Sequence, residues 1–153
     1  MFIFLFKYIV LYPLKIIILR HKPLIMTFEK YNFYCPNCKS QLDSESVILL
    51  NTTRSNGNCG EIHLSTSFGN YNFHHYPKIE FEKNEIINFS CPKCNVSLHS
   101  DLKPKFVNLI MRVEQQFDFE ILFSREAGIQ KTYIVTEDGI ESFGRDANVV
   151  DVD

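Results

Sequence analysis

Apolar and polar residues alternate along much of the chain after residue 30, with the period of two that is typical of β-strands. The clearest run begins at Phe117, where every second residue is apolar as far as Phe123, so one face of this segment points toward a core. Residues 68–71 indicate a turn or an aromatic loop, and no helix is strongly indicated after residue 25. We predict a mainly β fold, a small antiparallel domain with strands at 31–34, 46–51, 61–65, 78–82, 86–90, 105–113, 117–124 and 131–136.

Two tetrads of the form Cys-Pro-x-Cys are the most specific chemical feature of the chain. A Cys-x-x-Cys knuckle turns the backbone so that both sulfurs face one point, and the proline fixes φ in that turn. Asn95, just after the second tetrad, suits the left-handed conformation that such a turn needs. Four thiolates fill a tetrahedral zinc site and leave no position for water. We therefore predict one structural Zn²⁺, held by Cys35, Cys38, Cys91 and Cys94.

The spacing between the tetrads leaves other arrangements open. Residues 39–90 separate the pairs by 52 positions, against about 15–20 in a short zinc ribbon. Loop-closure entropy grows slowly with length, so this separation does not exclude a shared ion. A disulfide framework is disfavoured, because no cleavable secretory signal is evident and Cys59 makes the cysteine count odd. Two separate metal sites, sharing between chains and thiol redox chemistry remain as alternatives.

The first 25 residues form a hydrophobic segment with a different composition from the rest. Met1 to Leu19 is almost wholly apolar, but Lys7 and Lys15 lie inside it, and charged residues are costly in a bilayer. A membrane anchor would keep the following domain in the cytoplasm, by the positive-inside rule. A buried helix and a translation start at Met26 are the other hypotheses, and we favour the start at Met26. We expect a zinc-ribbon-like domain at 26–137 and a flexible acidic tail at 138–153.

The net charge argues against a nucleic-acid-binding protein, and the arrangement of the cysteines indicates the compartment. Residues 1–25 carry four basic residues and no acid, which leaves 12 basic and 18 acidic residues, a net charge of −6, for the remainder. Nucleic-acid binding needs clustered Lys and Arg, and only Lys103 and Lys105 lie close together in sequence. Cysteines arranged mainly as Cys-x-x-Cys pairs favour a reducing compartment, so we expect a cytoplasmic protein.

The two knuckles and the residues between them resemble a group of small, largely uncharacterised bacterial zinc-ribbon proteins. The resemblance extends over residues 33–136 and is specific at the knuckles. It implies zinc bound by the four tetrad cysteines and no established activity. A further cysteine that such proteins often carry near positions 124–129 has no counterpart here. The matching stretches are 33–38, 60–65 with 68–71, and 88–94 with 97–98.

Other residues able to bind metals or react are present but scattered. We expect His74 and His75 to be surface histidines of an aromatic loop, because neighbouring side chains on a strand face opposite ways. His63 and His99 are less favoured substitutes as metal ligands. Cys59 is most simply a lone thiol in a turn, with a fifth ligand or a redox-sensitive site as alternatives.

No nucleophile elbow, P-loop or His-Glu-x-x-His sequence is present, so we predict a protein that is not an enzyme. The favoured hypothesis is a structural zinc module that acts as a cytoplasmic binding or adaptor protein for a protein partner. A membrane contact follows only if residues 1–25 are an anchor. One alternative is a nucleic-acid-binding zinc ribbon that uses Lys93, Lys103, Lys105 and Arg112, and another is a thiol redox protein that uses a Cys-x-x-Cys pair. The predicted partner surface consists of Phe68, Tyr71, Phe73 and Tyr76.

Overall fold

The computed structural model describes residues 30–150, and these residues form β-strands without a helix. No helix in this part of the chain is therefore long and apolar enough to cross a membrane. The predictions for residues 1–25 lie outside the described residues. The strands are β1 (Tyr31–Tyr34), β2 (Asp43–Ser44), β3 (Val47–Thr53), β4 (Cys59–Ser65), β5 (Phe73–Tyr76), β6 (Asn88–Ser90), β7 (Phe106–Val113), β8 (Phe117–Ser124), β9 (Thr132–Thr136) and β10 (Gly139–Phe143).

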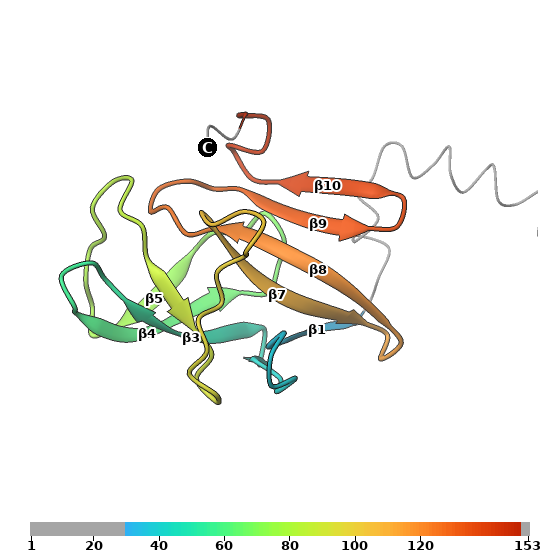
Figure 1. Cartoon of the computed structure of the whole chain (residues 1–153), viewed down its shortest axis with the longest axis horizontal. Coiled ribbons are helices and arrows are strands. Elements are labelled where there is room, and N and C mark those ends of the chain that lie inside the picture. Colours follow the sequence, from blue (N-terminus) through green and yellow to red (C-terminus); the bar gives the residue numbers. More distant parts are fainter. Residues whose placement is uncertain (1–29, 151–153) are drawn as a thin grey trace, which may run out of the picture. The chain divides into compact units, whose positions relative to one another are not determined.

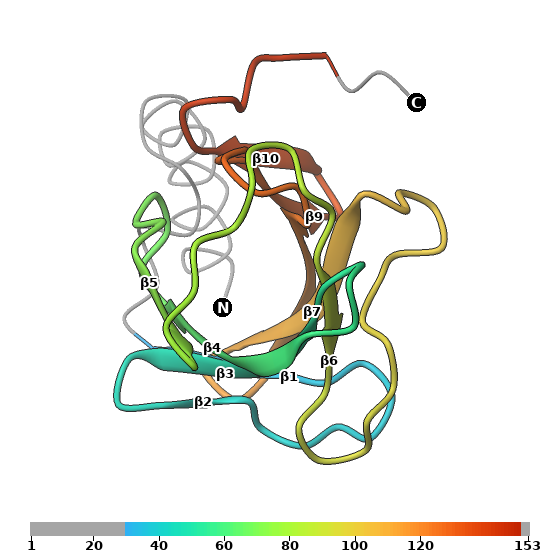
Figure 2. The same ribbon diagram turned by 90° about the vertical axis from the view of Figure 1, so that its left-hand side faces the viewer.

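The strands form two antiparallel sheets (Figure 1). The first sheet has the order β1-β7-β8-β9-β10, and the second has the order β2-β3-β4-β5, with β6 paired to β3. The two sheets face each other across a common interior (Figure 2). Alternate residues fill that interior, for example Ile48 and Leu50 from β3 and Val107, Leu109 and Met111 from β7, all at most 5% exposed. This alternation is the period-two pattern that predicted the strands.

Comparison with the sequence confirms an all-β fold and strands near most of the predicted positions. Two assignments in the middle of the chain were wrong. Residues 78–82 lie outside the strands, although Phe81 does pack inward against the rings of Phe73 and His75. The turn predicted at 68–71 is present, but His74 and His75, which were expected in an aromatic loop, lie on a strand, β5.

The predicted flexible tail also contains a strand, which is a third correction. Gly139–Phe143 form β10 and pair with β9, so the tail from residue 138 is not wholly flexible. The dipeptide Asp138-Gly139 favours a hairpin turn, but the sequence interpretation treated it as part of the flexible tail. β10 lies at the edge of the first sheet and leaves Ile140 64% exposed, so it lacks the clear apolar alternation of a central strand.

Candidate metal centre

The first knuckle is the turn of a tight hairpin between β1 and β2. The Cys35 amide donates to the carbonyl of Ser40 at 3.0 Å, and the Lys39 amide donates to the Cys35 carbonyl at 3.0 Å. A β-bridge between Tyr34 and Gln41 closes the hairpin. Lys39 has φ of 60°, a left-handed conformation that is uncommon for a residue with a Cβ. The backbone thus bends sharply enough to bring both thiols of the tetrad to one side.

The second knuckle repeats this geometry. The Cys91 amide donates to the carbonyl of Val96 at 3.0 Å, and the Asn95 amide donates to the Cys91 carbonyl at 2.9 Å. A bridge between Ser90 and Ser97 closes it. Asn95 has φ of 59°, which confirms the left-handed conformation predicted at this position. The two tetrads are therefore equivalent turns, with the same backbone hydrogen bonds at matching positions.

A longer sequence repeat underlies this equivalence. Both knuckles lie within a ten-residue pattern, Phe-x-Cys-Pro-x-Cys-x-x-x-Leu, which begins at Phe33 and again at Phe89. In each copy the leucine amide donates to the phenylalanine carbonyl, from Leu42 at 2.8 Å and from Leu98 at 2.9 Å. All four of these residues are buried. The sequence interpretation did not detect this repeat, although the matching leucine positions were a signal for it.

Each knuckle stands where the chain passes from one sheet to the other. The first connects β1 of the first sheet to β2 of the second, and the Leu42 carbonyl then accepts from the Leu49 amide in β3 at 2.9 Å. The second follows β6, and the Leu98 carbonyl accepts from the Asn108 amide in β7 at 2.7 Å. The cysteine cluster is thus positioned at the junction of the two sheets.

The four sulfurs lie at distances that suit a single metal ion. All four Sγ atoms are within 4.8 Å of one another. Cys35 Sγ is 3.9 Å from Cys94 Sγ, and Cys38 Sγ is 3.8 Å from Cys91 Sγ. Zinc bound tetrahedrally at about 2.3 Å from each sulfur sets the sulfurs about 3.8 Å apart. The predicted residues therefore come together with the dimensions of a tetrathiolate metal site.

The thiols divide into two inner and two outer groups. Burial raises the pKa of Cys35 to about 12 and also raises the pKa of Cys91. Hydrogen bonds with Ser40 lower the pKa of Cys38 to about 6, and a backbone hydrogen bond with Val96 lowers the pKa of Cys94. A metal ion favours thiolates at all four positions, because it binds only the deprotonated form.

Nearby N–H groups also face the sulfurs. The Lys93 amide donates to Cys91 Sγ at 3.3 Å. The Asn37 side-chain amide donates from the first knuckle to Cys94 Sγ of the second, at 3.6 Å. Donors in such positions orient thiolate ligands and offset part of their negative charge.

The remaining cysteine and the histidines lie outside this cluster. Cys59 is exposed at the start of β4, with its Sγ 3.4 Å from the Gly57 carbonyl oxygen. His63 Nε2 lies 2.6 Å from a carboxylate oxygen of Glu61, and exposed His99 lies beside Ser97. Among the described residues, the only group of this kind that could hold a metal is the four-cysteine cluster.

His75 corrects one prediction. It is only 7% exposed, whereas His74 is exposed as expected. His75 Nε2 lies 2.7 Å from the hydroxyl oxygen of Thr52, and Nδ1 lies 2.7 Å from the Pro77 carbonyl oxygen. Because the carbonyl can only accept, Nδ1 carries the proton and Nε2 accepts from Thr52. Both ring nitrogens are thus hydrogen-bonded inside the protein, and the spacing of residues in the sequence does not predict this role.

The predicted partner surface does not form a single patch. Phe68 packs against the rings of Phe33 and Phe143, at centroid distances of 6.2 and 5.2 Å. The Tyr71 hydroxyl donates to the Phe143 carbonyl at 3.0 Å and lies 2.9 Å from the hydroxyl oxygen of Thr132. These two aromatic residues fasten the loop after β4 to the first sheet.

Phe73 and Tyr76 are the two members of the predicted surface that remain open to solvent, at 45% and 56% exposure. They are three positions apart on β5, so their side chains lie on opposite faces of the strand. The Tyr76 ring packs on His63 at 5.1 Å, and the Phe73 ring packs on Phe81 at 5.8 Å.

The basic residues considered for nucleic-acid binding are also placed by the structure. Arg112 forms a bidentate ion pair with Asp118, at 2.7 and 3.0 Å, and lies 4.7 Å from the ring centroid of Tyr34. Lys93 is exposed on the second knuckle, while Lys103 lies over the rings of Phe106 and Tyr133.

No protein-family model matches the chain, and neither a curated protein nor a solved structure matches it. The fold and the site define an all-β protein of two antiparallel sheets, with a Cys-x-x-Cys…Cys-x-x-Cys cluster that could hold one metal ion.

Proposed function

We propose that the four-cysteine cluster holds one Zn²⁺ ion as a structural centre, in the manner of a zinc ribbon. The observation that carries the proposal is the set of cross-knuckle sulfur distances, 3.8 and 3.9 Å. Four thiolates would complete the coordination of zinc, so the ion would join the two knuckles and leave no position for a substrate.

The same geometry favours metal binding over thiol redox chemistry. Each sulfur–sulfur contact of 3.8 or 3.9 Å joins one knuckle to the other, not the two cysteines of one tetrad. A disulfide within either tetrad would withdraw two ligands from this arrangement. Both tetrads also lie in hairpin turns of β-sheets, whereas a thioredoxin-like pair begins a helix.

We further propose that the domain is a cytoplasmic, non-enzymatic binding module for a protein partner. The free thiols, including exposed Cys59, are consistent with a reducing compartment. β5 ends the order of the second sheet, and among the described residues no strand pairs with its outer edge. An extended segment of a partner would add to this edge, where Phe73 and Tyr76 flank the added strand on its two faces.

Elemental analysis of the full chain, purified without added zinc, tests the metal proposal. We expect one zinc per chain in the wild type and in Cys59→Ser, which keeps all four ligands. A folded, metal-free wild type would refute the structural zinc centre and would favour the redox hypothesis.

Affinity capture with matched variants tests the partner proposal. Tyr76→Ala should reduce the recovery of partner proteins, while Phe117→Ala should not, although Phe117 is equally exposed at 54%. Phe117 lies on β8 in the other sheet, so it controls for the loss of any exposed aromatic ring. Equal recovery by both variants would refute a contact at the β5 edge.

A further inference from the structure

The strands of the described chain repeat one arrangement twice. Val47 of β3 pairs with Ser65 of β4, and adding 59 to both residue numbers gives Phe106 of β7 paired with Ser124 of β8. The same shift converts the register of β4 with β5 into that of β8 with β9. Together with the repeated knuckle, these registers define a first half, β1 to β5, and a matching second half, β6 to β9.

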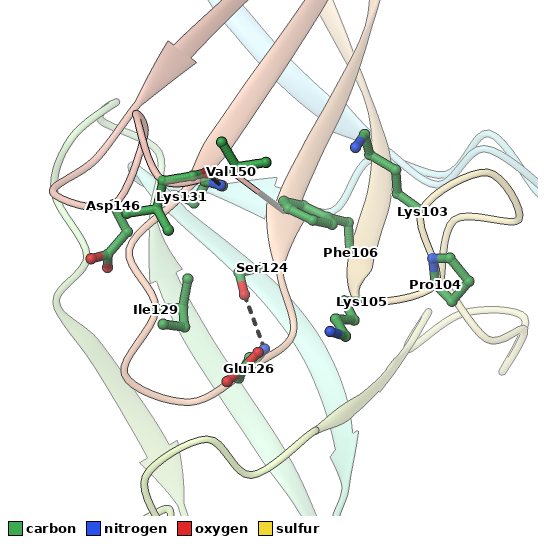
Figure 3. Close-up of a pocket in the computed structure, with 11 residues that line it drawn as sticks. Lys103, Pro104, Lys105, Phe106, Ser124, Glu126, Ile129, Lys131, Asp146 and Val150 are labelled. Atoms are coloured by element: carbon green, nitrogen blue, oxygen red, sulfur yellow. Dashed lines mark hydrogen bonds between the residues drawn. The ribbon is translucent and has the colours of Figure 1, made fainter. Parts of the chain in front are cut away.

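The loops after β4 and β8 match as well. In the first half, Ser65 Oγ accepts from the Ser67 amide at 3.1 Å. In the second half, Ser124 Oγ accepts from the Glu126 amide, also at 3.1 Å, as Figure 3 shows. The repeat therefore extends from the strands into the loops that lead to β5 and to β9.

The two loops differ in the residue just before a glycine. Gly69 and Gly128 are at matching positions, and both have a positive φ, of 83° and 90°. Phe68 precedes the first of them, and Ala127 precedes the second. The Phe68 ring packs against Phe143 of β10 at a centroid distance of 5.2 Å. The second loop thus carries a methyl group where the first carries an aromatic ring.

Among the described residues, β10 has no counterpart in the first half. β10 pairs with the outer edge of β9, and Phe143 lies opposite Thr132 there. The residue that matches Thr132 in the first half is Phe73 of β5. No described strand pairs with the outer edge of β5, and three of its four residues are exposed. β5 is therefore an open edge, whereas its equivalent, β9, is covered by a strand.

A groove of about 180 Å³ adjoins β5. Phe73, Phe81 and residues 123–131, including Ala127, line it. Further apolar residues of the lining are Ile62, Leu64, Ile87 and Phe89. An apolar group that entered this groove would be removed from water, which is favourable.

The matching groove beside β9 is smaller. It has about 100 Å³, and its lining includes Thr132 and residues 65–72 with Phe68. The aromatic ring of Phe68 fills space that the methyl group of Ala127 does not fill, which explains the larger groove beside β5.

We propose that β5 binds an extended segment of a partner protein as β9 binds β10, with one aromatic side chain of the partner in the groove beside Ala127. This proposal rests on the partner-binding function proposed above and adds the direction and register. The added strand runs antiparallel to β5, with an apolar residue opposite Tyr76 and, three positions later, an aromatic residue opposite Phe73. Ile140 and Phe143 have this spacing on β9. Main-chain hydrogen bonds supply affinity, and the groove selects the aromatic residue.

The probe is a synthetic peptide with the sequence of residues 137–145, which contains the β10 pattern. It is titrated into the full-length protein and followed by ¹H–¹⁵N NMR. We expect saturable shifts of the His74, Tyr76 and Ala127 amides, with a dissociation constant below about 1 mM. The Phe143→Ala peptide should bind at least about tenfold more weakly, because it lacks the aromatic side chain. Equal binding of the two peptides would overturn the proposal.

Matched alanine variants test whether the groove receives that side chain. Ala127→Leu fills part of the groove and should weaken binding of the peptide by about tenfold or more. Ala147→Leu adds the same group outside the groove lining and should change the affinity less than about twofold. Zinc content and urea midpoint show whether each variant is folded, and the two peptides test the wild type whatever the variants do. Equal affinities of two folded variants would contradict the groove.

The outcomes separate this proposal from the wider partner function. If Tyr76→Ala lowers partner capture but no peptide saturates at about 2 mM, the contact at β5 stands and the β10-like mode is overturned. If the peptide binds as expected but Tyr76→Ala leaves capture unchanged, the strand site is supported and only the captured partner's use of it is refuted. Shifts of the His74 amide with protein concentration alone would indicate pairing of two copies through β5 and would also overturn the proposal.

Discussion

Replacing Cys35 and Cys91 together by serine removes the buried cysteine from each knuckle and should abolish the proposed zinc binding. Both side chains are fully buried, at 0% exposure, and each belongs to a different cross-knuckle sulfur contact. Serine is nearly isosteric with cysteine but is a poor zinc ligand at neutral pH, so the variant tests coordination more than packing.

The expected loss of stability follows from the length of the chain segment that the proposed zinc ion would close into a loop. Cys38 and Cys91 are 53 positions apart in sequence. By the chain-entropy relation for disulfides, a cross-link that closes a loop of this length removes entropy from the unfolded chain worth about 4 kcal/mol. Since small domains have unfolding free energies of about 5–15 kcal/mol, losing the cross-link should leave the protein marginally stable.

Urea unfolding followed by circular dichroism, together with zinc analysis, measures both parts of this prediction. The double variant should contain no zinc and should lose at least about 4 kcal/mol of unfolding free energy. Cys59→Ser should stay within about 0.5 kcal/mol of the wild type, because Cys59 is exposed and outside the cluster. A double variant that still binds one zinc per chain, or that loses less than about 1 kcal/mol, would refute the reasoning.

Three further substitutions probe the fold. Glu85→Gln should destabilise the protein at neutral pH, because Glu85 forms a bidentate pair with partly buried Arg54 at 2.7 and 2.8 Å. Tyr71→Phe should cost about 1–3 kcal/mol of unfolding free energy, because it removes the hydroxyl group that makes two hydrogen bonds to the first sheet. Gly60→Ala should cost about 1–3 kcal/mol, because a Cβ there would lie 2.6 Å from the Tyr76 carbonyl oxygen.

The Glu85 prediction has a defined pH dependence. The hydrogen bond with Arg54 lowers the pKa of Glu85 in the folded state, so its stabilising effect is present above the unfolded pKa. That effect is lost as the pH falls through the lowered folded pKa. The difference in urea midpoint between wild type and Glu85→Gln should therefore shrink in acid, and a constant difference would contradict the ion pair's role.

Controls for the other two substitutions use the same elements. Tyr76→Phe removes a hydroxyl from an exposed ring and should leave the urea midpoint unchanged. If Tyr71→Phe also leaves the urea midpoint unchanged, the loop after β4 does not depend on its hydrogen bonds to the first sheet for stability. For Gly60→Ala, an unchanged melting temperature would show that the strand pair β4–β5 can move apart at little cost.

The sequence predicted those parts of the fold that depend on local alternation. Burial alternates along β7, so its period of two marked it directly. β8 was found from the same apolar alternation, although its Phe117 is exposed and its neighbours Ile121 and Leu122 are both buried. β5 and β10 lie at sheet edges, where three of the four residues of β5 are exposed and the alternation is weak. Each pairs with the strand just before it in the chain, β4 or β9, but an exposed edge strand carries little of the apolar alternation from which strands were predicted.

The four-cysteine cluster was predictable because a Cys-x-x-Cys turn is a local structure. What the sequence did not reveal was the tertiary use of single side chains. His75 is buried through a bond to Thr52, 23 positions away, and Tyr71 reaches Phe143, 72 positions away. The first of these bonds crosses β4 within the second sheet, and the second joins the loop after β4 to the first sheet. Both form only when segments apart in sequence have come together, so residue type and spacing gave no indication of them.

Because the knuckles lie at the junction of the two sheets, a change at an outer thiol would affect both sheets, although the thiol itself lies near the surface. Cys38 is the one tetrad cysteine whose side chain is exposed, so oxidants and chelators reach it first. Modification there would disrupt the proposed metal centre, which lies where the two sheets meet, and the core residues Ile48 and Leu109 lie between those sheets. With zinc bound as proposed, a reaction at this one exposed sulfur would remove a ligand and weaken the connection between the sheets, so the stability of the domain would depend on the redox state of its surroundings.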